Sequence, residues 1–395
     1  MPIPEKTTSQ SASYLAQGSL ERDMSEVITN ISPADTPFLS NLPVYDEAYE
    51  MKIEWQTDEL LPPGKNQRPE FDEYKFPMAA GVGRLHNFCQ IMAQSCKVSD
   101  VMQKARKTYK PKTDELSRQI TNYSKKLAFD MEYAIMSNAE AHAEAGSTLA
   151  MMGGIPYFMK EELLDVTLST TDGSVTTTQK HGLSTGSWVM LKGTKLPKEL
   201  TAGQRYYVRL DDTTPDTKFT LFNSLQDAVE KTNGISTLTD AGTAVKVLIN
   251  NVVDAGNAKF TLDMIDDAME LAYYRGGHPT QIWLNPTQKR RFSTLARELH
   301  TVNRNQTDKK ISDVTDVYES DFGVLEAKSH LNCSDDKIFL MDPSYWGLRY
   351  FTRPHLIPNS ELAKTGSYEK FVITSTLSLQ ASQPLASAVI NNVAR

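Results

Sequence analysis

The sequence predicts an α+β protein that carries a small, inserted all-β domain, and three observations lead to this prediction. A long amphipathic pattern predicts a single helix over about 113–138. The Thr-rich stretch 163–253 contains short strand patterns separated by turn signals. The stretch 254–340 then alternates helix and strand patterns. An all-β segment with helical segments on both sides is typical of a domain inserted at an exposed loop.

The composition is that of an ordinary globular protein. The chain has 395 residues, a formal charge of −7 and 39% hydrophobic residues, which is enough for two or three domains. The negative charge argues against tight nucleic-acid binding through bulk attraction. We expect neither a secretory signal nor a membrane span, because no long apolar run occurs. The three cysteines fit no zinc-binding spacing and are expected to be buried in a reducing cytoplasm.

The N-terminal stretch 1–44 is predicted to be an arm that orders on a partner. Residues 1–20 are rich in Ser, Thr and Gln. Thr36-Pro37 is a helix-start signal, since a capping residue precedes proline at the first helical position. Between these features lies a short apolar helical face that consists of Met24, Val27, Ile28 and Ile31.

The stretch 45–85 is predicted to be an extended hairpin. Met51, Ile53 and Trp55 alternate with polar residues, which is the pattern of a strand with two unlike faces. A second strand-like stretch, 86–98, returns along it. Because an isolated hairpin is marginally stable in water, the apolar face needs a surface to lie on. We therefore predict that these three residues contact a neighbouring subunit.

The long helix is preceded by a basic run. Thr113 is a plausible N-cap, and the apolar positions recur along one face for roughly 40 Å. We expect the basic run to face solvent, the lumen of an assembly or a subunit, because few aromatic residues are interleaved for base stacking. The basic residues are Lys104, Arg106, Lys107, Lys110 and Lys112.

One motif resembles a catalytic site. The sequence Gly182-Leu-Ser-Thr-Gly186 matches G-x-S-x-G, which in hydrolases requires a strand, a turn and then a helix around the serine. Here a strand pattern follows instead, so a hydrolase that uses Ser184 remains only an alternative. The histidines show no metal-ligand spacing. We predict no catalytic, metal or cofactor site, and no enzyme activity.

Several motifs in a fixed order carry a family resemblance. SPADTPFLSNL, IEWQTDEL, NFCQIMAQSCKVSD, LAFDMEYAI, MGGIPYF, GGHPTQIWLNPTQKRR and the C-terminal ELAKTGSYEKFVITSTLSLQASQPLASAVINN follow one another. Together they resemble tailed-bacteriophage major capsid proteins of the HK97 fold, in the SU10-type major head protein family. The resemblance covers about 30–160 and 255–393.

The resemblance implies an icosahedral shell that encloses a double-stranded DNA genome. The inserted domain is similar to the Ig-like or barrel modules of some phage proteins. The resemblance also implies a division of the whole chain into an N-terminal arm (1–44), an extended E-loop (45–85), a P-domain with the spine helix (86–162), the inserted domain (163–253), an A-domain (254–340) and the closing strands of the A- and P-domains (341–395). Lys65 and Asn359 match, by residue type, the cross-linking pair of some members of the wider fold, but no motif fixes them.

The implied partners are copies of the same chain in hexamers and pentamers. The segment before the shared motifs is too short for a fused scaffolding domain, so the resemblance implies a separate scaffolding protein or none. It also implies a portal, and it leaves the presence of cement proteins open. Packaged DNA would be contacted non-specifically, and no membrane is involved. The expected location is the virion capsid, assembled in the host bacterial cytoplasm. The alternatives are an encapsulin-like protein shell and, from the inserted domain alone, a phage tail or adhesin protein.

Overall fold

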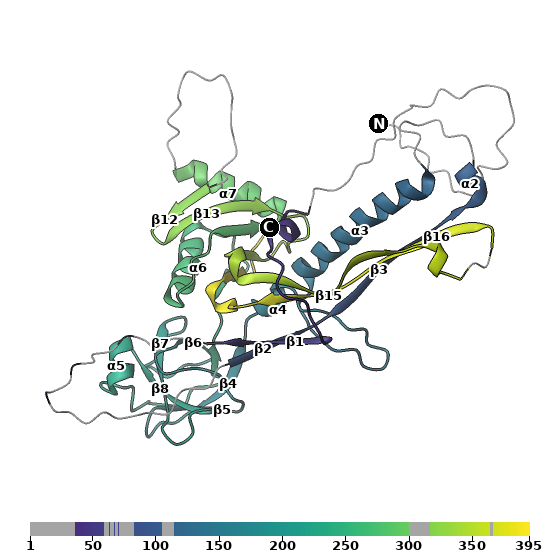
Figure 1. Ribbon diagram of the computed structural model, residues 1–395. Helices are drawn as coiled ribbons and strands as arrows, with labels where there is room; N and C mark the ends of the chain where they lie inside the picture. Colours follow the sequence, from purple (N-terminus) through teal and green to yellow (C-terminus); the bar gives the residue numbers. More distant parts are fainter. Residues whose placement is uncertain are drawn as a thin grey trace.

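The fold consists of three β-sheets, a closed barrel and seven α-helices in the part of the chain described by the computed structural model, which covers residues 36–58, 63, 67, 70, 83–104, 114–299, 317–363 and 366–395. A long helix and a long three-stranded sheet extend to one side (Figure 1). The barrel lies at the opposite end, and a six-stranded sheet with two helices lies between them.

The long helix is α3, Glu115–Ser137. The sequence predicted it over 113–138, and its length is about 34 Å at 1.5 Å per residue. Its inward face is apolar and buried, whereas Lys125 and Lys126 are exposed. The helix ends where Asn138 adopts an extended backbone conformation. The residues that α3 buries include Leu127, Met131, Ala134 and Ile135.

The three-stranded sheet lies directly under α3. Its strand order is β15-β16-β3, all antiparallel, with bounds Trp346–Ile357, Tyr368–Ala381 and Gln90–Ser99. Helix α3 packs on β3 and β16. Strand β15 is a sheet edge, and its register shifts between Tyr350 and Thr352 and again before His355. The short helix α2, Asp100–Lys104, follows β3.

A separate hairpin contains β1, Lys52–Thr57, and β2, Gly83–Phe88. The predicted return strand 86–98 is therefore two strands, because the chain changes partner at Cys89. Strand β2 pairs with β1, whereas β3 pairs with β16 along its whole length. Cys89 is fully buried at the switch, and its backbone N–H donates to Met51 O over 2.7 Å.

The six-stranded sheet has the order β10-β17-β14-β11-β13-β12. Helix α6, Leu262–Tyr274, and helix α7, Pro286–Leu299, cover one of its faces. Thr261 caps α6 by accepting from Met264 N. The strand bounds are Val252–Asp254, Ala388–Asn391, Ile338–Met341, Gln281–Leu284, Gly323–Ser329 and Val317–Ser320, in sheet order.

The other face of this sheet packs against the rest of the protein. Trp283 points to that face and contacts Phe38 edge-on, with ring centroids 5.0 Å apart. Phe38 lies in α1, Pro37–Asn41, the helix that the Thr36-Pro37 signal predicted. The first backbone N–H groups of α1 donate to the buried Glu132 carboxylate of α3, with Phe38 N at 3.1 Å from Oε1. One carboxylate thus fixes α1 to the long helix.

The Thr-rich stretch, which the sequence predicted to be all-β, forms a closed six-stranded barrel. Its order is β4-β5-β8-β7-β6-β9, and it has an apolar interior of its own that includes Val189, Val208 and Phe219. The short helix α5, Leu225–Glu230, packs on its outside. The strand bounds are Leu163–Leu168, Ser174–Thr177, Lys218–Phe222, Arg205–Leu210, Trp188–Lys192 and Lys246–Leu248, in barrel order.

Candidate functional site

The base of the hairpin is anchored inside its own subunit. Trp55 is 9% exposed, and its indole Nε1 donates to Ala381 O at 2.8 Å. Its ring also contacts Phe158 of α4, Ile155–Phe158, with centroids 5.9 Å apart. Ile53 is 4% exposed in the same small cluster. The hairpin therefore leaves the body of the protein from a fixed origin.

These contacts correct the prediction that Met51, Ile53 and Trp55 rest on a neighbour. Ile53 and Trp55 are covered by their own chain, and only Met51 is substantially exposed, at 38%. The alternating pattern correctly identified a buried face. It could not identify what covers that face, because Trp55 and its acceptor Ala381 are 326 positions apart. A contact between Met51 and a neighbour stays a prediction.

Asn87 is the residue that sequence reasoning missed at this base. It is fully buried, its Nδ2 donates to Gly153 O and Leu379 O, and its Oδ1 accepts from Gly153 N and Phe88 N. The amide thus satisfies four backbone groups from three segments. The signal that could have indicated this close packing is the Gly-Gly pair in MGGIPYF. A Cβ at Gly154 would lie 2.4 Å from Ile135 O, so no larger residue fits there.

The predicted basic run is only partly described. Lys104 ends α2 and is exposed. The other four residues, Arg106, Lys107, Lys110 and Lys112, lie outside the described residues, as does Lys65. On either side of this stretch, the Gln103 amide donates to the Asp114 carboxylate and connects α2 to the start of α3. The direction in which the basic run faces stays a prediction.

Two arginines connect the barrel to α6, one that belongs to the barrel and one at the end of α6. Arg205 of β7 pairs with Glu270 of α6 at 2.7 Å, and its guanidinium lies 3.7 Å from the centre of the Tyr274 ring. Arg275, at the end of α6, stacks 4.5 Å from the Trp188 ring and donates to Trp188 O at 2.9 Å. Each arginine combines a hydrogen bond with a cation–π contact. The barrel is therefore held to the body by a reciprocal pair of contacts.

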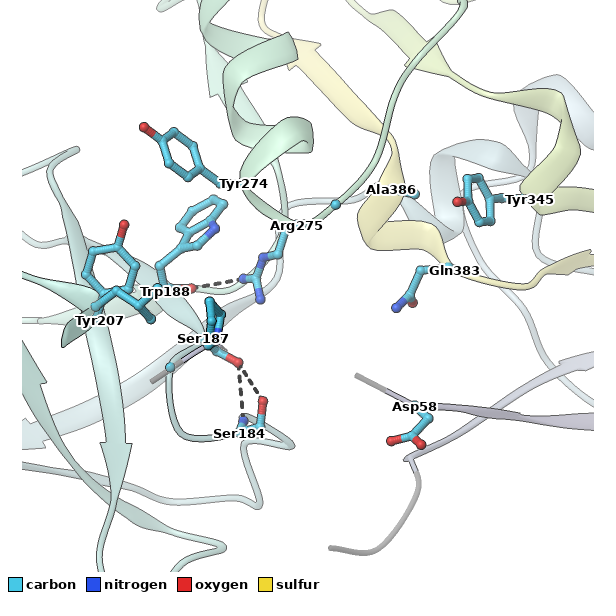
Figure 2. A pocket seen from close by; sticks show the side chains of 14 residues that line it. Asp58, Ser184, Ser187, Trp188, Tyr207, Tyr274, Arg275, Tyr345, Gln383 and Ala386 are labelled. Carbon is cyan, nitrogen blue, oxygen red and sulfur yellow. Dashed lines mark hydrogen bonds between the residues drawn. The ribbon is translucent and has the colours of Figure 1, made fainter. Parts of the chain in front are cut away.

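A cavity of about 650 Å³ opens beside this joint, between the barrel, α6 and the end of the hairpin (Figure 2). Aromatic side chains of Trp188, Tyr207, Tyr274 and Tyr345 line it, and Asp58 stands at its hairpin side. The hairpin, the barrel and helix α6 therefore meet at one place.

Ser184 also lines the cavity, but its surroundings differ from those of a nucleophile elbow. Its Oγ lies 2.9 Å from Ser187 Oγ, and strand β6, not a helix, follows. His181, the closest histidine in sequence, accepts from Leu183 N through Nδ1 and packs on Phe219. Burial lowers the pKa of His181. The local structure that G-x-S-x-G needs for nucleophilic catalysis is absent here.

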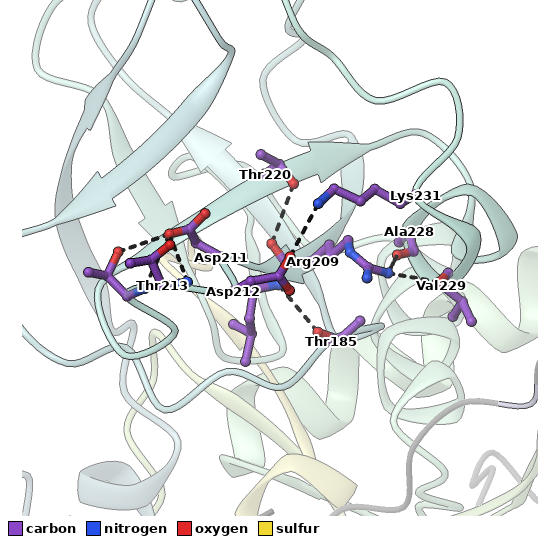
Figure 3. Close-up of polar contacts among 11 residues, drawn as sticks. Thr185, Arg209, Asp211, Asp212, Thr213, Thr220, Ala228, Val229 and Lys231 are labelled. Atoms are coloured by element: carbon purple, nitrogen blue, oxygen red, sulfur yellow. Dashed lines mark hydrogen bonds and ion pairs between the residues drawn. The ribbon is translucent and has the colours of Figure 1, made fainter. Parts of the chain in front are cut away.

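The end of β7 and helix α5 are stabilised by a second set of polar contacts within the barrel (Figure 3). Arg209 donates to Ala228 O and Val229 O at 3.0 and 2.8 Å, which places a cation at the C-terminal end of α5. Asp211 accepts from the N–H groups of the turn after β7, and Lys231 pairs with Asp212 at 3.3 Å. These charges stabilise turns and the helix end.

The described residues form neither a metal site nor a reactive thiol. Among them, no cluster of His, Cys, Asp and Glu could hold a metal ion. The thiols of Cys89 and Cys333 are free and buried, as expected, and Cys96 is half-buried. Burial raises the pKa of Cys89 to about 11, so its reactive thiolate is scarce at neutral pH. None of the described helices has the length and apolar character needed to cross a membrane.

Comparison with known proteins gives one family and a set of similar structures. A family model described as SU10 major capsid protein matches residues 5–394. A chain of the cyanophage A-1(L) capsid is similar with a TM-score of 0.56 and 11% identity, over 98% of this chain and 100% of that chain. The capsid of a native GTA particle follows at 0.52 and 10%, over 97% and 99%. The search of curated proteins finds no match. At such low identity, the structural likeness shows the fold alone.

Proposed function

The chain belongs to the SU10 major capsid protein family, and from this membership we propose that it self-assembles into an icosahedral shell around the double-stranded DNA of a tailed bacteriophage. The observation that carries the proposal is the family match over nearly the whole chain. A shell subunit acts through its contacts, so its function needs no catalytic group. We propose accordingly that the protein is not an enzyme.

The arrangement of the described elements supports an assignment to the HK97 fold. In it, α3 is the spine helix and, with the sheet β15-β16-β3, forms the P-domain. The six-stranded sheet with α6 and α7 is the A-domain, which in this family clusters around the local axes. The hairpin β1-β2 is the base of the E-loop. The barrel is an inserted domain, because the chain enters it after α4 and leaves it into β10.

The anchored hairpin base supports a role for the E-loop in joining subunits. Trp55 and Asn87 fix both strands to the subunit, so the segment beyond Asp58 starts from a defined direction. A loop held in this way can reach an adjacent copy with a smaller loss of conformational entropy on docking. Each contact is weak, but a closed shell repeats it in every subunit.

Further partners follow from the family. We propose hexamers and pentamers of this chain, assembled in the host bacterial cytoplasm with a separate scaffolding protein and a portal, and then stabilised by cement proteins. The formal charge of −7 suits a container that contacts packaged DNA without sequence preference. The exposed Lys104 is the described end of the basic run that would face the lumen or a neighbouring subunit.

Size measurement of the expressed chain tests the proposal. Produced alone and with phage scaffolding protein, the chain should form particles of megadalton size in light scattering and closed shells in negative-stain images. A chain that stays monomeric at high concentration with its partner proteins present would contradict the proposal. Labelling of Ser184 by a fluorophosphonate probe would favour the hydrolase alternative, with Ser187→Ala as the control for local disruption.

A further inference from the structure

An apolar groove of about 380 Å³ runs between α3 and the edge strand β15. Leu127 and Met131 form its floor on the helix side, and Ile373 of β16 closes it below. Leu356 on β15 is 43% exposed, although it is a large aliphatic residue at a sheet edge. A single exposed leucine is ordinary, but here it borders a groove with an apolar floor, on which further apolar side chains would be buried favourably.

The groove exists because α3 does not cover the whole sheet. Among the described elements, the helix packs mainly on β3 and β16, and the residues of the outer half of β15 are largely exposed. The register shifts of β15 lie in that same half, and Pro354 there has no backbone N–H to donate. Pairing with a further strand is therefore disfavoured, and the space suits side chains from a helix better.

The helix wall of the groove has a spacing that a second helix can match. Ser124, Leu127, Ala128 and Met131 line it at positions i, i+3, i+4 and i+7. Two of the four are small, which lets another backbone approach closely. Ser124 satisfies its hydroxyl within α3 by donating to Ile120 O at 2.8 Å. The wall therefore presents no polar group that an apolar side chain would leave unpaired.

The chain itself supplies a matching segment next to the groove. Residues 1–35 lie outside the described residues, and the described chain begins at Thr36, three positions before Leu39, which lines the groove. From residue 31 to Thr36 the chain can span up to about 17 Å, so the preceding stretch is within reach. Its apolar residues have the same i, i+3, i+4, i+7 spacing, namely Met24, Val27, Ile28 and Ile31.

The charges agree with this pairing. Lys125 follows the groove residue Ser124 on α3 and is exposed, whereas the exposed Arg353 on β15 already pairs with Glu47 at 3.5 Å. The sequence of the arm has Glu21, Arg22, Asp23 and Glu26 beside its apolar residues, so this stretch is net acidic. We propose that residues 24–31 of the arm form a helical turn or two whose apolar face fills the groove between α3 and β15 of the same subunit.

Disulfide trapping in the full-length chain tests the proposal. Ile28→Cys is combined with Ala128→Cys inside the groove and, as a matched control, with Tyr133→Cys, which is 57% exposed on the same helix. Tyr133 lies nine positions from Ser124, on the opposite side of the helix. Ile28→Cys alone controls for links to the native Cys96. Thermal unfolding of each reduced variant checks that α3 is intact.

If the arm lies in the groove, the Ile28→Cys/Ala128→Cys variant should form an intrachain disulfide, seen as a monomer band of altered mobility on a non-reducing gel. The yield of this disulfide should be about ten-fold higher than that of the Ile28→Cys/Tyr133→Cys variant. Equal or absent linking in the two pairs would overturn the proposal. A ladder of linked dimers and larger species would overturn it as well, since the groove would then hold a neighbour's arm. The result is independent of shell formation, because both partners belong to one chain and the parent's particle size is measured separately.

Discussion

Glu132 Oε1 lies 2.5 Å from His330 Nε2, and both side chains are buried. The other ring nitrogen of His330, Nδ1, accepts from Asn332 N at 3.1 Å, so the proton sits on Nε2 and is donated to the carboxylate. Since Glu132 also accepts from Phe38 N, this side chain joins α1, the long helix and the segment after β13. It is the polar link between the helix layer and the six-stranded sheet.

Replacing Glu132 by Leu should destabilise the subunit strongly. The backbone N–H of Phe38 and the His330 imidazole would each lose a buried acceptor, at about 1–3 kcal/mol per group. Glu132→Gln is the matched control, because its carbonyl oxygen can still accept from Phe38 and His330. Chemical denaturation of the unassembled chain measures both variants. A Glu132→Leu variant with the parent's free energy of unfolding would show that the carboxylate does not hold this junction.

Trp55→Ala should lower the free energy of unfolding by about 3–5 kcal/mol, the usual cost of removing a large buried aromatic side chain. Met51→Ala on the same strand is the control and should change it by less than about 1 kcal/mol, because Met51 is exposed. If the Trp55→Ala variant unfolded at the same denaturant midpoint as the parent but failed to assemble, Trp55 would be a residue of the intersubunit contact and the assignment to its own core would be wrong.

The barrel, expressed as residues 160–250, should fold cooperatively on its own, because it has a closed strand order and a separate apolar interior. Trp188 is its single tryptophan and packs against Arg275 of the body. Its fluorescence emission in the isolated barrel should therefore shift to longer wavelength while urea unfolding stays sigmoidal. An insoluble fragment, or a gradual transition without a plateau, would contradict an independent domain.

The acidic side of α6 predicts a pH effect. Burial and the neighbouring Asp263, Asp321 and Asp267 raise the pKa of Asp266, although the Tyr318 hydroxyl donates to it. A carboxyl whose pKa is higher in the folded state makes the fold more stable as pH falls through that pKa. Asp266→Asn keeps an acceptor for Tyr318 and should remove this gain. Unfolding midpoints measured from pH 7 to pH 4 test it, and parallel curves for both proteins would contradict it.

At alkaline pH the other member of this pair, Tyr318, acts in the same direction, because its stabilising contribution is also lost as pH rises. Burial, together with the bond to Asp266 and its charge, raises the pKa of Tyr318 to about 12. The neutral phenol is therefore favoured by folding, and its contribution, complete below the ordinary tyrosine pKa of about 10, is lost as pH rises towards 12. Tyr318→Phe should weaken the pH dependence of stability above pH 10. An unchanged alkaline profile would show that Tyr318 ionises equally in both states.

Local patterns were sufficient to predict most of the elements. The long helix was expected over 113–138 and spans Glu115–Ser137, since its apolar spacing extends for many turns. The Thr36-Pro37 signal marks a real helix start because the fixed backbone of Pro37 acts locally at the first helical position, although the Thr36 side chain makes no capping hydrogen bond. The strands of the barrel followed from turn residues and short alternating runs in the same way.

Long-range pairing could not be predicted from such patterns. The stretch 86–98 looks like one strand, yet it changes partner at Cys89, and its second partner, β16, lies near the other end of the chain. The same limit explains Ile53 and Trp55, whose cover comes from distant segments. The burial of a polar residue such as Asn87 could not be predicted from its neighbours in the sequence, because asparagines are mostly exposed and the flanking residues do not distinguish a buried one.

A cryo-electron microscopy reconstruction of the assembled particle tests the central claim most directly. The account predicts a closed icosahedral shell in which the six-stranded sheets gather around the local axes and the segment beyond Asp58 lies on an adjacent copy, while Trp55 stays buried in its own subunit. Particles without closed symmetry, or a shell in which that segment folds back onto the subunit that carries it, would contradict the account.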